Sequence, residues 1–549
     1  MRAGAGQDLC DACEANSAID TEIHEDGFYD VGLFLHDCLF QSVLLCTGNQ
    51  NLRHGGNISD RLAQSELGKL VLVLLLNFTY TRHPMSRQQA IDSATAYFDQ
   101  GTFQSTLARR VAIPTESQEP GKIPVLTSYL TDELAPTLKG LGFDCKIIPN
   151  PIEGGAPFMV ASRTESDAGF TVLTYGHGDV VRGYAPQWIE GLEPWTLKIQ
   201  GDRWYGRGTA DNKGQHTINL AALEQVLQAR SGKLGYNVTL LIEMGEEMGS
   251  PGLREMCKQH GDLLKADLFL ASDGPRVSAS RPTLFLGSRG AFNFELRLNV
   301  RQGAHHSGNW GGLLKNPGIR LVHAIASMVD AKGKILVPKL LPSSLPDNVK
   351  KALANIQVGG GPNDPEIDPD WAEPGLTSTE RVFAWNTFET LAFKTGNPDA
   401  PVNAIPGYAI AFCQLRYVVG SDNENFLKHI REHLDAHGFT DVEAVASRGE
   451  AAEATRLDPD NAWVKMAAAS ITRTTGKTVD ILPNLGGTLP NDAFSKILGL
   501  PTVWVPHSYA ACSQHAPNEH MLGSVARESL QLMAGLLWDL GDEGAKIAA

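Results

Sequence analysis

The chain lacks the features that mark a membrane protein or a nucleic-acid-binding protein. Its apolar stretch from Leu70 to Leu76 is far shorter than the ~20 residues of a membrane-spanning helix, and it begins too late for a secretory signal. Basic residues are in the minority, with 47 Lys and Arg against 62 Asp and Glu and a net charge of -15. Nucleic-acid binding needs an excess of positive charge on one face. We therefore expect no membrane and no nucleic acid as a partner.

Cysteine is also scarce. Four of the eight cysteines fall in the first 46 residues, and the other four are scattered singly at Cys145, Cys257, Cys413 and Cys512. Scattered cysteines are typical of reduced thiols in a cytosolic protein, so we expect a cytoplasmic location. Cys10 and Cys13 have the spacing of a zinc knuckle, but no second pair follows, which favours ordinary thiols there.

The length of 549 residues exceeds what a single hydrophobic core supports, so we expect two domains. A content of 42% hydrophobic and 20% charged residues is that of a soluble globular protein. We interpret residues 1–84 as a poorly ordered N-terminal extension. An amphipathic helical pattern then opens at Met85, with Ser86 available as the N-cap, and this predicts the start of the folded part.

Strand and helix patterns alternate along the first folded part, residues 85–289. Strand patterns cover Thr171 to Tyr175, Asn237 to Glu243 and Asp267 to Ser272, and helical spacing covers Gly214 to Ala229. This order predicts an α/β domain with a largely parallel mixed sheet between helices. Functional residues are then expected at the carboxyl ends of the strands. We expect residues 421–549 to complete the same domain.

A second unit interrupts this domain at residues 290–420. Ala291 to Val300 and Tyr408 to Tyr417 alternate between apolar and polar residues, and Asn316 to Val329 has helical spacing. These patterns predict an inserted α+β domain, in which helices cover one face of a half-exposed antiparallel sheet.

Five short segments carry most of the acidic and histidine residues that suit metal chemistry. They are Tyr175-Gly-His-Gly-Asp-Val-Val181, Gly206-Arg-Gly-Thr-Ala-Asp-Asn-Lys-Gly214, Glu243-Met-Gly-Glu-Glu-Met-Gly249, Ser272-Asp-Gly-Pro275 and Gln514-His-Ala-Pro-Asn-Glu-His520. A divalent cation needs imidazole and carboxylate ligands gathered from several loops. Taken singly, His177 is more simply a core histidine and Asp211 a turn residue. The five segments together predict a metal-dependent hydrolase.

The adjacent acids Glu246 and Glu247 suggest a division of labour. Consecutive residues leaving a strand point to opposite sides, so one carboxylate can bind a cation while its neighbour stands over a water molecule. The second carboxylate can then move a proton from the water to a leaving nitrogen. An isolated Glu-Glu pair is usually a solvated acidic turn, and only the other four segments favour the catalytic interpretation.

In content and order, the five segments resemble those of the M20 metallopeptidases, the carnosinase, carboxypeptidase and aminoacylase group of zinc hydrolases. The resemblance covers about Met85 to Leu540. It implies two divalent ions per chain, with zinc favoured and cobalt or manganese as alternatives. It also implies that His177 and Asp273 bind one ion, that Glu247 and His515 bind the other, and that Asp211 bridges them.

The resemblance assigns further roles around these ligands. Glu246 would be the general base, and Asp179 would orient the His177 imidazole. A cis peptide is implied at Asp211-Asn212. Asn212 stands where many relatives have a second acid, a departure that removes no ligand.

The inserted unit resembles the family's lid, which implies a homodimer formed through this domain. Within Gly303-Ala-His-His-Ser-Gly308, His306 is a better match than His305 for the histidine that stabilises the oxyanion. Asn403 and Arg416 resemble lid residues that hold polar groups of the substrate. Gly487, within Gly486-Gly-Thr-Leu-Pro490, lies in a segment that would offer backbone donors to the carboxyl end of the substrate. Arg416 could hold a carboxylate with paired hydrogen bonds, although an arginine on an alternating strand is usually a surface residue.

The remaining histidines and tryptophans favour structural roles, namely His216, His507, His520, Trp188, Trp195 and Trp204. Three functions then compete. A dipeptidase or carboxypeptidase acting on small peptides is favoured by the lid segment around His306. An N-acyl amino-acid deacylase, acting on acetyl- or succinyl-amino acids, is the alternative. A non-catalytic binding protein on the same fold is disfavoured because every expected ligand and the base are present.

Overall fold

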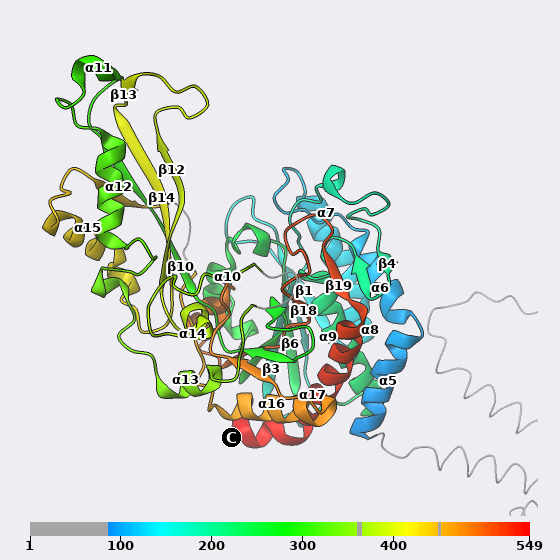
Figure 1. The fold of residues 1–549 in the computed structure, drawn as a ribbon. Helices are drawn as coiled ribbons and strands as arrows, with labels where there is room; N and C mark the ends of the chain where they lie inside the picture. The colour runs from blue at the N-terminus through cyan, green and yellow to red at the C-terminus, as the bar shows by residue number, and fades with distance from the viewer. Residues whose placement is uncertain (1–85, 360–364, 448–451) are drawn as a thin grey trace, which may run out of the picture. The chain divides into compact units, whose positions relative to one another are not determined.

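A computed structural model describes residues 86–359, 365–447 and 452–549 (Figure 1). The expected extension at residues 1–84, with Cys10 and Cys13, lies outside the described residues. Helix α5 (Arg87–Asp99) begins where the sequence predicts it. The Ser86 side chain accepts a hydrogen bond from the Gln89 backbone, and the Gln89 side chain accepts one from the Ser86 backbone. This reciprocal capping box satisfies two N–H groups that the helix leaves unpaired.

An eight-stranded mixed sheet forms the centre of the catalytic domain, in the order β1-β2-β6-β3-β7-β17-β9-β16. Its strands are β1 (Asp144–Ile148), β2 (Phe158–Arg163), β3 (Thr171–His177), β6 (Asn237–Glu243), β7 (Leu268–Ala271), β9 (Thr283–Phe285), β16 (Asp480–Leu482) and β17 (Thr502–Trp504). The run β6-β3-β7-β17 is parallel, whereas β1 and β2 add antiparallel strands at one edge. The expected α/β class with a largely parallel mixed sheet is confirmed.

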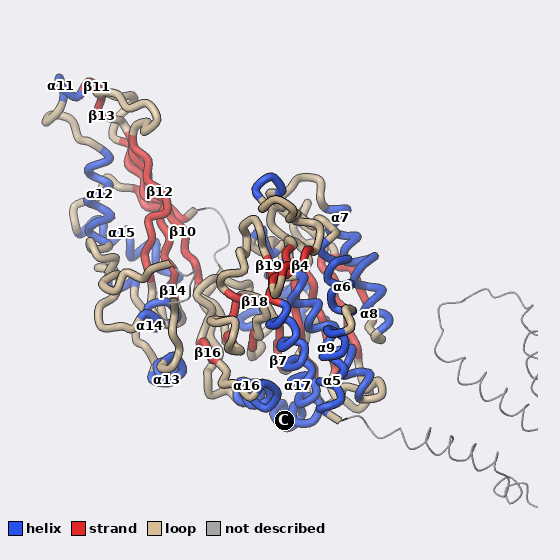
Figure 2. The backbone as a smooth tube through the Cα atoms, turned by 45° about the vertical axis from the view of Figure 1, so that its right-hand side comes forward, coloured by secondary structure: helices blue, strands red, loops and turns tan. Residues whose placement is uncertain are grey.

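Successive residues of the central strands face opposite sides of this sheet, as the strand period of two requires. On β6, Leu240 and Ile242 join one hydrophobic cluster and Leu241 joins the other. The helices that pack in the first cluster include α5, α6 (Thr102–Val111), α7 (Ile123–Ser128), α8 (Ala135–Gly140), α9 (Lys213–Ala229), α16 (Ala462–Thr475) and α17 (Gly523–Ala548). Figure 2 shows these helices beside the sheet. Both faces are therefore covered, which explains the nearly continuous apolar runs of β6 and β7.

Aromatic rings fill the second cluster. The rings of Phe269 and Phe494 stack with their centroids 4.2 Å apart, and Trp504 lies 4.9 Å from Phe269. Replacing a buried phenylalanine such as Phe269 with alanine typically costs about 3 to 5 kcal/mol of stability. This packing holds in place the central strands whose ends carry the acidic loops.

The parallel strands place their carboxyl ends at one edge of the sheet. Strand β3 ends at His177, β6 ends three residues before Glu246, and β7 ends two residues before Asp273. Their alignment follows from the register, in which His177 is paired with Glu243. The sequence segments with metal-binding character therefore meet where functional sites of α/β sheets usually lie.

Smaller strand pairs hold the loops around this edge. A three-stranded sheet contains β4 (Lys198–Gln200), β5 (Arg203–Tyr205) and β19 (His520–Leu522). A second short pair joins β8 (Pro275–Arg276) to β18 (Ser508–Tyr509). Within the described residues, no helix combines the length and the apolar character that crossing a bilayer requires.

The lid contains a four-stranded antiparallel sheet in the order β12-β14-β10-β15. These strands are β10 (Gly290–Asn299), β12 (Thr387–Thr395), β14 (Tyr408–Tyr417) and β15 (Glu443–Ala446). Helices α12 (Pro317–Met328) and α15 (Phe426–Ala436) share its hydrophobic core. A short pair, β11 (His305–His306) with β13 (Ala404–Ile405), stands next to α11 (Ser307–Trp310). The expected antiparallel lid sheet with helical cover is confirmed.

The expected lid boundaries at residues 290–420 need correction at two places. Helix α15 and strand β15 lie beyond residue 420, yet β15 pairs with β10 and Ile430 of α15 is buried in the lid core. Conversely, α13 (Asp347–Leu353) and α14 (Ser378–Phe383) lie inside the expected lid, but Leu353 and Phe383 pack in the second cluster of the catalytic sheet. Short amphipathic helices show that one face is buried but not which sheet buries it.

Candidate metal centre

The candidate metal centre is built from two clusters of side chains. The first cluster consists of His177, Asp211 and Asp273, and the second of Asp211, Glu247 and His515. Within each cluster the potential ligand atoms lie within 4.8 Å of one another. Asp211 belongs to both, so its two carboxylate oxygens face two different imidazoles. These are the five residues that the M20 resemblance implies as ligands, and the structure brings all five together.

The first cluster is fully buried. His177 Nε2 lies 2.9 Å from Asp211 Oδ1 and 3.6 Å from Asp273 Oδ2. His177 ends strand β3, and Asp273 follows strand β7, which neighbours β3 in the sheet. The parallel pairing of these two strands therefore determines the spacing of the cluster.

The second cluster is partly open to solvent. His515 Nε2 lies 3.0 Å from Asp211 Oδ2 and 3.0 Å from Glu247 Oε2. The side chain of His515 is 53% exposed, whereas that of Glu247 is 3% exposed. His515, which lies in the loop after β18, thus forms the solvent side of the cluster.

Asp179 connects the imidazole of His177 to the turn that carries the paired glutamates. Nδ1 of His177 donates to the carbonyl oxygen of Asp179 at 3.0 Å and lies 3.4 Å from its Oδ1. The two carboxylate oxygens of Asp179 accept hydrogen bonds from the backbone N–H groups of Glu246 and Glu247, both at 3.1 Å. Asp179 therefore contacts the His177 ring mainly through its carbonyl oxygen and the turn of Glu246 and Glu247 through its carboxylate.

The acids of the centre repel one another and are held together by the two imidazoles. Burial lowers the pKa of His177, but its hydrogen bonds to Asp179, Asp211 and Asp273 outweigh that effect and hold the pKa well above its usual value. Hydrogen bonds to Asp211 and Glu247 raise the pKa of His515 to about 11.

The pKa values of the carboxylates are shifted as well. Burial raises the pKa of Glu246 well above its usual value and that of Glu247 to about 7. Burial and the nearby Asp211 carboxylate raise the pKa of Asp273. Burial also disfavours the charged form of Asp211, but its contacts with His177 and His515 outweigh this and hold its pKa below the ordinary range. Positive charge among these acids is therefore strongly favoured.

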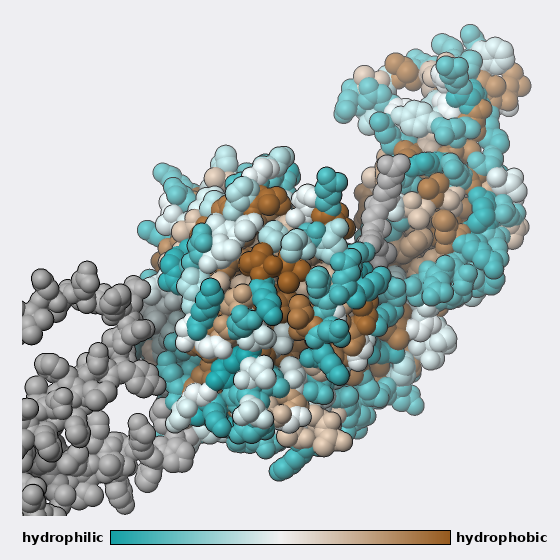
Figure 3. All heavy atoms as spheres, turned by 180° about the vertical axis from the view of Figure 1, so that it is seen from behind, coloured by the Kyte–Doolittle hydropathy of each residue, from teal (hydrophilic) through white to brown (hydrophobic). Residues whose placement is uncertain are grey.

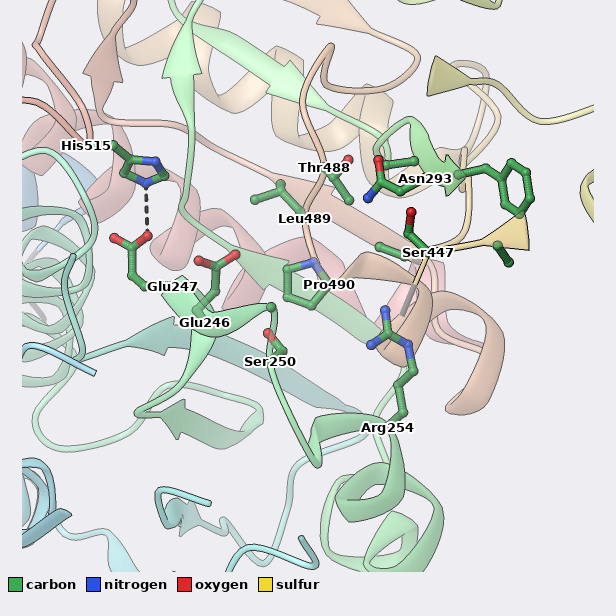
Figure 4. A pocket seen from close by; sticks show the side chains of 15 residues that line it. Glu246, Glu247, Ser250, Arg254, Asn293, Ser447, Thr488, Leu489, Pro490 and His515 are labelled. Carbon is green, nitrogen blue, oxygen red and sulfur yellow. Dashed lines mark ion pairs between the residues drawn. The ribbon is translucent and has the colours of Figure 1, made fainter. Parts of the chain in front are cut away.

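Glu246 and Glu247 point into a pocket of about 380 Å³ (Figure 4). Glu246 belongs to neither cluster, and its Oε2 lies 4.0 Å from His177 Nε2. Across the pocket, the lining includes Asn293 and Thr488. The acids thus border a space large enough for a small substrate.

Arg416 and Gly487 lie near the Thr488 side of this pocket. Nη1 of Arg416 donates to Oγ1 of Thr488, and its Nε donates to Gln414 Oε1 at 2.8 Å. Burial lowers the pKa of Arg416. Arg289 donates to the carbonyl of Gly486, so two arginines contact the Gly486 to Thr488 segment.

His306 and Asn403 are not brought to the pocket lining. Both are exposed: His306 ends strand β11 and Asn403 directly precedes β13, and the Ser307 N–H donates to the Asn403 carbonyl at 2.9 Å. His306 Nδ1 accepts a hydrogen bond from the Gly308 N–H at 3.2 Å. The structure therefore leaves their predicted roles in oxyanion and substrate binding untested.

Three other histidines have protein partners that fit the expected structural roles. His216 lies 2.8 Å from the Tyr129 hydroxyl, His507 lies 3.0 Å from the Ser272 hydroxyl, and His520 lies 2.6 Å from the Tyr509 hydroxyl. Among the tryptophans, Trp188 and Trp204 are buried, and Trp204 stacks on Phe98 at 5.2 Å. The peptide Asp211-Asn212 is cis, as the resemblance implies.

Glu519, to which the sequence patterns assign no role, contacts the Asp211 loop through four hydrogen bonds. A signal was present in the segment from Gly206 to Gly214. Its glycines permit a tight loop whose inward backbone N–H groups need an acceptor, and a nearby buried acid is a suitable one.

The fold is that of a metallopeptidase family. The chain belongs to peptidase family M20/M25/M40, whose model matches residues 173–539. It is similar to a Beta-Ala-His dipeptidase of Homo sapiens, with 31% identity over 304 residues that make up 52% of this chain and 58% of the relative. It is also similar to a Cysteinylglycine-S-conjugate dipeptidase of Corynebacterium striatum, with 29% identity over 252 residues, 44% of this chain and 54% of the relative.

The matched stretches span just over half the length of these two curated relatives. Among solved structures, an M20 family metallo-carboxypeptidase, Sso-CP2 of Sulfolobus solfataricus, superposes with a TM-score of 0.67 at 23% identity. That match covers 80% of this chain and 99% of the other. It establishes the shared fold.

Proposed function

We propose that the chain is a hydrolase that uses two divalent cations to cleave the amide bond of small peptides. The observation that carries the proposal is that two ligand clusters share the single carboxylate of Asp211. The donor set fits the cations, because imidazole and carboxylate are ligands for Zn²⁺ and also suit Co²⁺ and Mn²⁺. Zinc is the favoured ion.

The charge of the site supports the same fit. Buried carboxylates repel one another unless positive charge lies between them. His177, Asp211 and Asp273 would hold one ion, and Asp211, Glu247 and His515 the other. The ions would replace the protons that the raised pKa values place on His177 and His515.

Glu246 would be the general base. Bound cations would lower the pKa of a water molecule and polarise the scissile carbonyl. Glu246 would take the proton of that water and pass it to the departing amine. Its position supports this role, since it borders the pocket without belonging to either cluster. Asp179 would keep both Glu246 and His177 in place.

We assign the carboxyl end of the substrate to the Thr488 side of the pocket. Arg416 would bind the terminal carboxylate, and the backbone N–H of Gly487 would donate a hydrogen bond to the same end of the substrate. Asn403 and His306 would contact the substrate from the lid, with His306 stabilising the oxyanion. Because neither lines the pocket, such contacts require either movement of the lid or the lid of a second copy.

The relatives favour a dipeptidase over an N-acyl amino-acid deacylase. Beta-Ala-His dipeptidase and Cysteinylglycine-S-conjugate dipeptidase both carry a dipeptidase name, as does the Cys-Gly metallodipeptidase of Candida albicans. We extend this activity to the present chain as part of the proposal. The pocket volume fits a dipeptide.

We further propose a homodimer formed through the lid. Strand β12 is an edge strand that pairs only with β14 in its sheet, and it exposes Leu391 and Phe393. Helix α12 exposes Ile319 and Val322. Hydrophobic side chains are visible among hydrophilic ones on the lid in Figure 3. An unpaired edge and exposed apolar residues suit an isologous contact with a second copy.

We place the protein in the cytoplasm. The four cysteines of the described residues, Cys145, Cys257, Cys413 and Cys512, are all free thiols. Unpaired thiols are typical of a reducing compartment. Localisation of the tagged full chain by microscopy and fractionation would test this assignment.

A substrate panel tests the proposed reaction. The chelator-treated chain would be reloaded with Zn²⁺, Co²⁺ or Mn²⁺ and assayed against free-amino dipeptides, N-acetyl amino acids and N-succinyl amino acids. We expect dipeptides to have the highest kcat/KM. A preference for the N-acyl compounds would establish the deacylase alternative, and no hydrolysis with any ion would refute both.

A further inference from the structure

Glu519 is a buried carboxylate that joins two of the three loops of the second cluster, those of Asp211 and His515. It lies four residues after His515 and directly before strand β19, whose His520 pairs with Tyr205 of β5. The Gly206 N–H donates to the Glu519 carbonyl at 3.0 Å. Its backbone is therefore fixed against the start of the loop that leads to Asp211.

The side chain of Glu519 binds that loop from within. Oε1 accepts hydrogen bonds from the backbone N–H groups of Gly208 at 3.0 Å, Ala210 at 2.9 Å and Asp211 at 3.1 Å. Oε2 accepts a hydrogen bond from Arg207 Nη1 at 2.7 Å. Glu519 is 1% exposed and Arg207 is fully buried, so water does not replace these bonds.

The loop has the conformation that this contact requires. Gly208 has a φ of +87°, and a Cβ atom there would lie 2.9 Å from Cδ of Lys213 and 3.0 Å from Cγ1 of Val180. Glycine allows the chain to turn around the carboxylate without either clash. The backbone N–H groups of residues 208, 210 and 211 then converge on a single oxygen.

We propose that Glu519 is a positioning residue that sets the distance between Asp211 and His515 and thereby the cation affinity of the second cluster. This inference rests on the proposed two-cation function. Glu519 shares a loop with His515 and is hydrogen-bonded to Asp211, but it contacts neither His177 nor Asp273 by any hydrogen bond or ion pair described for these residues. The second cluster should therefore depend on Glu519 more than the first does.

Cobalt titration of the full chain tests this role. After chelation, wild type, Glu519→Ala and Glu519→Gln would be titrated with Co²⁺ and followed by visible absorption and calorimetry. We expect wild type to bind two ions and Glu519→Ala to bind one of them about tenfold or more weakly, which is the usual effect of losing a residue that orients a ligand. The spectrum of its tightly bound ion should match that of His515→Ala, since both variants weaken the second cluster.

The variant Glu519→Gln keeps the proposed role testable if the alanine variant does not fold. Its amide oxygen can still accept from the three loop N–H groups, but its NH₂ group would oppose Arg207, so we expect a smaller loss at the same cluster. Glu133→Gln is the matched control, because Glu133 is also buried and accepts from two arginines, Arg109 and Arg110. Both cobalt affinities should be unchanged in this control.

Wild-type affinity for both ions in the two Glu519 variants would overturn the inference, as would equal weakening of both clusters. Wild type that binds fewer than two cobalt ions would instead overturn the proposed function, and the inference would fall with it.

Discussion

At the scale of single residues, the centre sets the proposed ligands apart from the acid that we propose transfers the proton. Glu246 and Glu247 are neighbours, yet only Glu247 belongs to a cluster. Asp179 holds the backbone of both through the two oxygens of one carboxylate. The turn therefore keeps Glu246 beside the pocket at a fixed distance from the ligands, which is the arrangement that a general base needs.

Glu246→Gln should abolish most turnover and leave cation binding intact. The amide cannot accept a proton, and the loss of a general base typically lowers the rate by about 10² to 10⁴-fold. Cobalt stoichiometry should stay at that of wild type, because Glu246 is in neither cluster. Initial-rate kinetics and cobalt titration on the same preparation would check both outcomes.

The exposed Glu190 provides the control for this experiment, and Glu190→Gln should behave as wild type. Near-normal hydrolysis by the Glu246→Gln protein with its cations bound would show that another group is the base.

Arg416→Met should raise KM far more than it lowers kcat. A hydrogen bond to a charged group contributes about 1.5 to 3 kcal/mol, so we expect a rise in KM of roughly tenfold or more. Arg416→Lys should give an intermediate KM, since lysine keeps the charge but not the paired geometry. Steady-state kinetics with a dipeptide and its C-terminal amide would check this, and an unchanged preference for the free carboxylate would contradict the assignment.

At the scale of elements, the exposed edge of the lid sheet is the clearest candidate for an interface. Among the described residues, strand β12 is the terminal strand of its sheet, and it exposes the side chains of Leu391 and Phe393. Soluble proteins usually protect such an edge. A second copy of the chain would cover it.

Leu391→Arg should convert the dimer to a monomer. A charged side chain at the contact would be desolvated without a partner, which disfavours association. Light scattering coupled to size-exclusion chromatography would measure the mass. Ile189→Arg, at an equally exposed position of the catalytic domain, should leave the dimer intact. A wild-type chain that is monomeric throughout would contradict the proposed interface.

Regular elements with clear periodicity were predicted well, whereas their assignment to a domain was not. Strands β6 and β14 have the bounds that their patterns indicate. The residues of helix α15 were expected in the catalytic domain, within 421–549. Its apolar stripe would suit either sheet, and only its packing with Phe439 and Val442 reveals the lid core. The strand β15 is four residues long, too short for alternation to identify its partner.

At the scale of the whole molecule, residues 86–549 contain both the sheet and the clusters on which the proposed activity depends. Deleting residues 1–84 should therefore preserve soluble protein and dipeptide hydrolysis. The capping box at Ser86 lies within the retained chain and would still start helix α5. Expression yield, melting temperature and kcat/KM of the shortened chain would test this, and loss of activity or solubility would show that the extension is needed.

The five proposed ligand positions follow from the resemblance of the five segments to the M20 family, and the parallel strands β3, β6 and β7 bring the segments of His177, Glu247 and Asp273 to one edge of the sheet. The role of Glu519 was not predictable in the same way. Three of its four hydrogen-bond donors are the backbone N–H groups of Gly208, Ala210 and Asp211, which any sequence provides. The glycines of the segment from Gly206 to Gly214 indicate that some acceptor is needed, but side-chain spacing does not show which acid supplies it, so the folded chain is needed to identify Glu519.

The interleaving of the lid with the catalytic domain has a consequence for how the molecule melts. The polypeptide passes between their hydrophobic cores four times, at Leu286 to Phe292, Leu341 to Leu345, Ala384 to Phe388 and Ala454 to Leu457. An inserted domain joined to its host only at its two ends can unfold independently. Here α13 and α14, in the middle of the insertion, pack in the second cluster of the catalytic sheet. Differential scanning calorimetry should accordingly record a single endotherm, because the two hydrophobic cores should unfold cooperatively.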